Sequence, residues 1–193
     1  MYDARMIGKF AKGKTAVFID AANIFYSQRT LGWRIDYERL ASYLRSEVDI
    51  VGLHYYTGVI GENEGQIAFL KKLESFGYAI TAKEVKLIKL PGGEVTSKGS
   101  LDIELALDAY MQRDVYDTCI LFSGDSDFAY LLDVLKREAK KVVVVSTRAH
   151  ISKELVIRAK YIDLPKLRNG IERGLKSRSR TSRLPKFDRG NDI

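Results

Sequence analysis

Apolar runs of strand length alternate along the chain with segments whose apolar residues recur at helical spacing. Buried-strand patterns occupy residues 15–20, 48–58, 78–90, 117–124 and 141–146, with a short last strand at 161–164. Helical patterns occupy residues 36–47, 63–77, 101–113, 127–140 and 152–160. Residues 91–100, which begin with Pro91, Gly92 and Gly93, are expected to form a loop. The pattern therefore predicts strands and helices in alternation.

The strands are apolar almost throughout, and "VVVV" at residues 142–145 is the clearest example. Runs of this kind indicate strands that are buried on both faces of a sheet. Together with the alternating order, they predict an α/β fold with a doubly wound, mostly parallel sheet sandwiched by helices. We expect a single domain at residues 14–167, preceded by an N-terminal extension at 1–13 and followed by a tail at 168–193.

The composition narrows the class of protein. A chain of 193 residues with 46% hydrophobic and 30% charged residues is typical of a soluble protein with one sizeable core. No apolar run approaches the roughly 18 residues of a membrane span, and no signal-type segment is seen, so we expect a cytoplasmic protein. One cysteine, Cys119, and two histidines give little basis for a disulfide, a histidine-rich metal site or a Ser-His-Asp triad.

The positive charge is concentrated at the C-terminus. From Arg168 onward, eight basic and three acidic residues give the tail a net charge of +5, out of +7 for the whole chain. A basic tail on a nearly neutral body suggests an anionic partner, of which nucleic acid is the most common. The alternative is a flexible, solubilising tail that binds nothing specific.

Polar side chains follow two strands that are expected to lie side by side. The strand at 15–20 ends in Asp20, with Asn23 three residues later. The strand at 117–124 leads into Ser123, Asp125 and Asp127. Because ligands bind outside the carboxyl ends of the strands in such sheets, these side chains are expected to share one site.

A third acidic segment, "KGSLDIELALD", carries Lys98, Asp102 and Asp108 into the same region. Six helical residues turn through about 600°, so Asp108 would lie roughly 120° around the helix from Asp102 and ~9 Å further along it. Both carboxylates cannot then point at one small site. We favour Asp102, because the helix begins there.

Four carboxylates in one pocket would repel each other and raise their own pKa values. A hard divalent cation such as Mg²⁺, which prefers oxygen ligands, would relieve this repulsion among Asp20, Asp102, Asp125 and Asp127. The chemistry indicated is attack of a metal-activated water on a phosphodiester. Purely structural roles stay open: Asp20, Asp125 and Asp127 could each cap a helix, and Asp102 could simply favour a helix dipole.

Three segments carry a family resemblance. "FIDAANIF" (18–25), "KGSLDIELALDAY" (98–110) and "LFSGDSDFAYLLD" (121–133) resemble the three motifs of NYN domains, in particular the LabA-like bacterial branch of the PIN-like nucleases. The resemblance covers about residues 16–164. It implies an α/β/α sandwich and a ribonuclease site that uses Mg²⁺ or Mn²⁺. By motif position, it implies catalytic and metal-binding roles for four aspartates and supporting roles for four further residues: Asp20, Asp102, Asp125 and Asp127, then Asn23, Ser123, Lys98 and Asp108.

The sequence thus predicts a metal-dependent ribonuclease whose partner is RNA, more often single-stranded than duplex. Side chains near the strand ends that could contact RNA are Tyr26, Arg29, Trp33, Arg34, His54, Tyr55 and Tyr56. The alternative is a nucleic-acid-binding or regulatory module with an inactive site. A phosphatase is a weaker alternative, because Ala22 stands where a DxD motif has its second aspartate. Nothing in the sequence positively indicates a homodimer.

Overall fold

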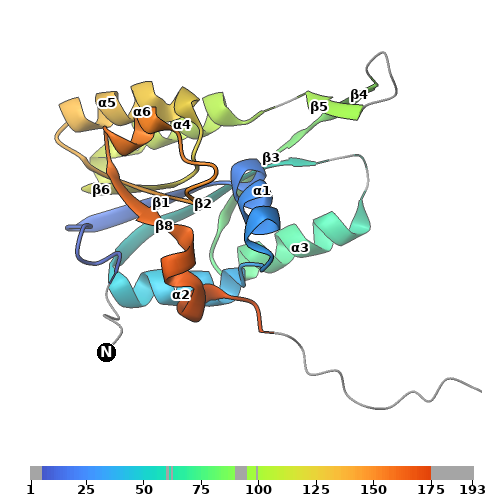
Figure 1. Cartoon of the computed structure of the whole chain (residues 1–193), viewed down its shortest axis with the longest axis horizontal. Helices are drawn as coiled ribbons and strands as arrows, with labels where there is room; N and C mark the ends of the chain where they lie inside the picture. Colours follow the sequence, from blue (N-terminus) through green and yellow to red (C-terminus); the bar gives the residue numbers. More distant parts are fainter. Residues whose placement is uncertain (1–5, 60, 62, 90–94, 99, 175–193) are drawn as a thin grey trace, which may run out of the picture.

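The computed structural model describes residues 6–59, 61, 63–89, 95–98 and 100–174. At its centre is a six-stranded sheet with the strand order β3-β2-β1-β6-β7-β8, in which every neighbouring pair is parallel (Figure 1). These strands are β1 (Lys14–Asp20), β2 (Asp49–Val59), β3 (Ala79–Glu84), β6 (Thr118–Phe122), β7 (Lys141–Ser146) and β8 (Lys160–Asp163). The predicted doubly wound α/β fold is confirmed.

Helices cover both faces of the sheet (Figure 1). One face packs against α1 (Ala21–Leu31), α2 (Tyr37–Glu47), α3 (Glu64–Ser75) and the short α7 (Arg168–Ile171). The other face packs against α4 (Asp102–Met111), α5 (Ala129–Arg137) and α6 (Lys153–Val156). Three short 3₁₀ turns are also present: η1 (Arg113–Val115), η2 (Ser126–Phe128) and η3 (Leu164–Leu167). Among the described helices, none combines the length and apolarity that crossing a bilayer requires.

The central strands owe their position to uninterrupted burial. Every residue of β6 is buried, and in β7 only Lys141 is exposed. Side chains alternate between the faces, so Ile120 and Phe122 join the core under α1 and α2, whereas Cys119 and Leu121 join the core under α4 and α5. Local signals also agree with the fold, since Asp36 caps α2 and Asn63 caps α3 as the helical patterns require.

Helix α1 is absent from the sequence-based expectations. Its buried positions are Ala21, Ile24 and Ser27, which are spaced by three but include only one large apolar side chain. A helix that packs through small and polar residues gives a weak apolar period, and the pattern at 21–31 is therefore hard to recognise.

The expected single strand at 78–90 and loop at 91–100 were wrong in part. Strand β3 ends at Glu84, and β4 (Lys86–Lys89) and β5 (Val95–Lys98) form a separate antiparallel pair. Short alternating segments such as "KLIK" and "VTSK" acquire their pairing from a partner strand, which a single-segment pattern does not reveal.

Residues on both sides of 14–167 also contribute to the packed body. Ile7 and Ile171 are fully buried in the core beneath α1 and α2. Glu172 pairs with Ile35 in an antiparallel bridge, and the amide of Arg173 donates to the carbonyl of Arg34 at 2.8 Å. The start of the basic segment is thereby fixed against the loop that follows α1. The remainder of that segment, 175–193, lies outside the described residues.

Candidate metal centre

The centre of the site lies where the winding of the sheet reverses. Strands β1 and β6 are neighbours, but the chain leaves them toward opposite faces, β1 through α1 and β6 through α5. Their register pairs Phe18 with Leu121 and Ile19 with Phe122, so Asp20 and Ser123 leave the sheet side by side. Ligand sites in open α/β sheets form at this kind of reversal.

Ser123 connects the two strand ends. It is fully buried, and its hydroxyl donates to Oδ2 of Asp20 at 2.9 Å. The hydroxyl oxygen of Ser123 in turn accepts from the amide of Asp125 at 3.2 Å. A buried hydroxyl that both donates and accepts fixes the position of the acidic loop relative to β1.

Asp20 also caps α1. Its Oδ1 accepts from the amides of Ala22 at 3.1 Å and Asn23 at 3.2 Å. In turn, Oδ1 of Asn23 accepts from the amide of Gly124 at 3.0 Å. Asp20 therefore caps a helix and also lies beside the acidic site. Through Asn23, the first turn of α1 holds the loop after β6 in place.

Three carboxylates converge at this edge of the sheet. One oxygen each from Asp102, Asp125 and Asp127 lies within 4.8 Å of the others. Asp102 is the first residue of α4, and Asp125 caps η2 by accepting from the amide of Asp127 at 3.0 Å. Asp20 lies outside this group of three, although its charge acts on the same region.

The pKa values of two aspartates at this edge are raised, mainly by burial. Burial raises the pKa of Asp20 above its ordinary value of 3.8, against hydrogen bonds from Asn23 and Ser123 that lower it. Burial also raises the pKa of Asp102, and the charges of Asp125 and Asp127 raise it further. None of the ion pairs among the described residues involves Asp20 or the three converging carboxylates. The local negative charge is thus uncompensated by the described side chains.

The chain is similar to known proteins over most of its length. The NYN domain profile matches residues 14–165. The chain belongs to the NYN domain family. A relative, the Low amplitude and bright protein LabA of Synechococcus elongatus, is 34% identical over 169 residues, which are 85% of this chain and 90% of LabA. A crystal structure of a protein of unknown function, VPA0982 of Vibrio parahaemolyticus, superposes with a TM-score of 0.67 at 25% identity, over 80% of this chain and 94% of that chain.

Asp108 lies apart from the three carboxylates in this NYN domain. Its Oδ2 accepts from the hydroxyl of Tyr56 at 2.9 Å. Tyr56 in turn lines a small cavity of about 60 Å³ together with Asp20 and Asp102. Asp108 therefore contacts a wall of the site, and among the described residues it is not part of the group of three converging carboxylates. Lys98 ends β5, but its side chain lies outside the described residues.

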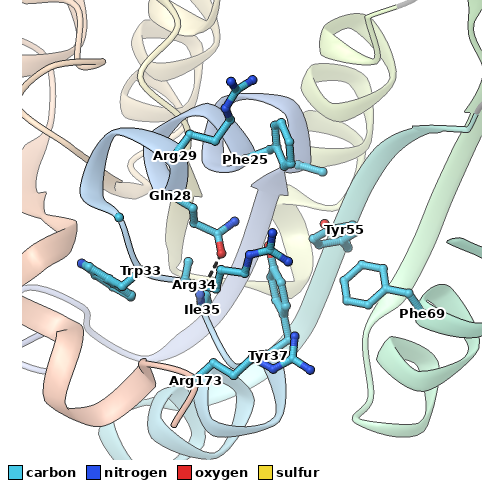
Figure 2. A pocket seen from close by; sticks show the side chains of 12 residues that line it. Phe25, Gln28, Arg29, Trp33, Arg34, Ile35, Tyr37, Tyr55, Phe69 and Arg173 are labelled. Carbon is cyan, nitrogen blue, oxygen red and sulfur yellow. Dashed lines mark hydrogen bonds between the residues drawn. The ribbon is translucent and has the colours of Figure 1, made fainter. Parts of the chain in front are cut away.

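A larger cavity of about 560 Å³ opens on the other face of the sheet, next to Ala21 (Figure 2). Of the side chains that the sequence suggested for RNA contact, Arg29, Trp33, Arg34 and Tyr55 line it, whereas Tyr26, His54 and Tyr56 do not. Sequence reasoning missed Phe25, Gln28, Tyr37, Phe69 and Arg173, which also line it. The bridge between Ile35 and Glu172 brings Arg173 there, and such a long-range pair leaves no local signal.

The pKa shifts predict a pH dependence of folding in the absence of metal. A carboxyl group whose pKa is raised in the folded protein binds its proton more tightly there than in the unfolded chain. Its contribution to the free energy of unfolding is therefore fully present below the unfolded pKa near 3.8, and is lost as the pH rises through the folded pKa. We expect Asp102→Asn, which stays neutral, to be more stable than the wild type in EDTA, by a margin that grows from about pH 4 to pH 7. Thermal melts across this range measure the difference. A margin that shrinks with rising pH would contradict the shift.

Proposed function

We propose that this NYN domain protein is a metal-dependent ribonuclease that hydrolyses RNA phosphodiester bonds. The observation that carries the proposal is the convergence of Asp102, Asp125 and Asp127 within 4.8 Å at the carboxyl edge of the sheet. Membership of the NYN family supports it, since NYN domains are generally nucleases. Asp20 completes the acidic surroundings from the end of β1.

The donor set fits Mg²⁺ or Mn²⁺. All the available side-chain ligands are carboxylate oxygens, which hard divalent cations prefer, and neither sulfur nor imidazole is present among the three. The raised pKa of Asp102 shows that its charge is disfavoured as the site stands. A bound cation would reverse that effect, stabilise charge on the phosphate and lower the pKa of a bound water.

The protein's own residues have distinct tasks in this proposal. Asp102 and Asp125 would hold the cation, and the more exposed Asp127 would complete the site and orient the attacking water. Asp20 adds negative charge and accepts a hydrogen bond from the Ser123 hydroxyl, and this bond links the ends of β1 and β6. Asn23 fixes Gly124, so the backbone between Ser123 and Asp125 keeps its position while substrate enters and leaves.

The test is cleavage of a labelled single-stranded RNA by the purified chain in Mn²⁺, Mg²⁺ or EDTA. We expect cleavage in one or both metals, none in EDTA, and a loss of ~100-fold or more in Asp125→Asn with RNA binding retained. Asp114→Asn, an exposed aspartate in η1 outside the acidic group, is the matched control and should cleave as the wild type does. Cleavage that persists in EDTA or in Asp125→Asn would refute the assigned site.

The alternative is a nucleic-acid-binding module without turnover. One observation favours it: the cavity of about 560 Å³ with its arginines and aromatic rings is built from residues other than the three converging carboxylates. Binding could therefore persist where catalysis does not. RNA binding with no cleavage in any metal would support this function over hydrolysis.

A further inference from the structure

A second cavity lies near the end of β1, on the face of the sheet covered by α1, α2 and α3. We propose that the cavity shown in Figure 2 holds one nucleotide of a single-stranded RNA, with the base against exposed aromatic rings and its phosphate near the arginines. The identification of RNA rests on the proposed function. The cavity itself is separate from the acidic centre.

The charge of the cavity favours an anion. Its lining includes Arg29, Arg34 and Arg173 and no acidic residue. These arginines come from α1, from the loop after α1 and from the segment after α7, so three separate parts of the chain contribute basic residues to the lining. Within the described part of the chain, none of the three guanidinium groups has an ion pair or hydrogen bond. Unpaired guanidinium groups are well suited to bind phosphate.

The aromatic part of the cavity is suited to a base. Phe25 and Phe69 are 53% and 39% exposed, which is unusual for phenylalanine in a packed domain. Phe69 is supported by edge contacts with Tyr37 and Tyr55, at centroid distances of 5.8 and 6.3 Å. Tyr37 and Tyr55 are buried, and their ring centroids lie 5.3 Å apart, so the exposed ring of Phe69 packs against two fixed side chains. Bases stack on such rings regardless of sequence.

The path between the two sites is short along the sheet. Ala21, at the edge of the cavity, directly follows Asp20. The register pairs Ile19 with Tyr55 and Asp20 with Tyr56, so adjacent β2 side chains line the two cavities on opposite faces. An RNA strand that crosses the carboxyl edge of the sheet would contact both sites.

The shape favours a strand over a free nucleotide. A smaller cavity of about 110 Å³ shares Ile35, Tyr37, Phe69 and Arg173 with the larger one and continues to Lys72 and Phe76, with Asp36 and Glu38 also in its lining. The space available to a ligand therefore continues beyond the larger cavity. A continuous chain can occupy such a path, whereas a free nucleotide would leave part of it empty.

The test measures binding without cleavage, using the full chain, a fluorescent single-stranded RNA and EDTA. We expect the double variant Arg34→Gln/Arg173→Gln to bind at least about tenfold more weakly, with a smaller slope of log K against log salt. Phe69→Ala should also weaken binding by about tenfold through lost stacking. The control Arg137→Gln/Lys153→Gln removes the same charge from the opposite layer and should change the affinity less than about twofold. Circular dichroism and thermal melts confirm that each variant is folded.

The outcomes separate this site from the proposed activity. If the wild type binds RNA and only the cavity variants lose affinity, the site is supported even where no cleavage is found. If the cavity variants and the control bind equally well, the site is refuted even where cleavage is strong. Adenosine monophosphate serves as competitor: failure to displace the RNA at millimolar concentration supports a strand site, and displacement at micromolar concentration refutes it in favour of a free nucleotide.

Discussion

Asp102→Asn is expected to lower metal-dependent RNA cleavage by ~100-fold or more. Asp102 is the one member of the converging group that comes from α4, whereas Asp125 and Asp127 share one loop. Without the charge of Asp102, the two remaining carboxylates of the group both lie on the segment at η2, and a cation would lose the negative charge that α4 supplies. Asparagine keeps the size of the side chain and an oxygen able to accept a hydrogen bond, so the change is mainly one of charge.

The same variant has a readout that does not depend on activity. Manganese should raise the melting temperature of the wild type, because a ligand that binds only the folded state stabilises it. The increase should be much smaller in Asp102→Asn, measured by thermal melts with and without the metal. Glu104→Gln is the matched control, since Glu104 lies in the same first turn but pairs with Lys83 at 2.7 Å. An equal metal-induced increase in Asp102→Asn and the wild type would exclude Asp102 as a ligand.

Gly124→Ala is expected to destabilise the protein by about 3 kcal/mol. An added Cβ would overlap the carbonyl oxygen of His150 and would lie 2.7 Å from Oγ of Ser146. The backbone cannot move aside easily, because the amide of Gly124 donates to Asn23 at 3.0 Å and its carbonyl accepts from the amide of Ser152 at 2.9 Å. For a chain of this size, the loss corresponds to about 6–12 °C in melting temperature.

Cleavage should fall with stability in Gly124→Ala, because the displaced loop carries Asp125 and Asp127. Gly174→Ala is the control, since a Cβ there would meet nothing within 4 Å and its backbone is not in the left-handed region. Equal melting temperatures for Gly124→Ala and the wild type would show that the loop adapts, and the rigid positioning proposed for it would then be wrong.

Much of the fold could be predicted because the central strands carry their burial in their own sequence. The apolar runs that form β1, β6 and β7 are buried on both faces, and continuous apolar runs of this length are typical of strands in a parallel sheet. Prediction was weakest for α1 and for the pair β4 and β5. In α1 the buried surface is small and partly polar, and in the antiparallel pair each of β4 and β5 depends on the other for its hydrogen bonds.

In the candidate site, too, the features with a local sequence signal could be predicted, and those that depend on distant residues could not. The sequence places Asp20 and Ser123 at adjacent strand ends, and their hydrogen bond follows directly from the parallel register. The helical geometry that separated Asp108 from Asp102 agrees with the contact between Asp108 and Tyr56. Arg173 could not be placed beside Arg34, because nothing within either segment signals a contact between residues so far apart in the chain.

The double use of Asp20 affects how substitutions at this position are to be interpreted. Its two oxygens accept from the first turn of α1 and from Ser123, so the carboxylate helps to fold the protein as well as to surround the acidic centre. Truncation to alanine would remove a helix cap worth about 1 kcal/mol in addition to a charge, and the two losses would be confounded in any single rate. Asparagine retains the capping oxygen and removes only the charge. Comparing the two substitutions separates what Asp20 does for the architecture from what its charge does for the chemistry.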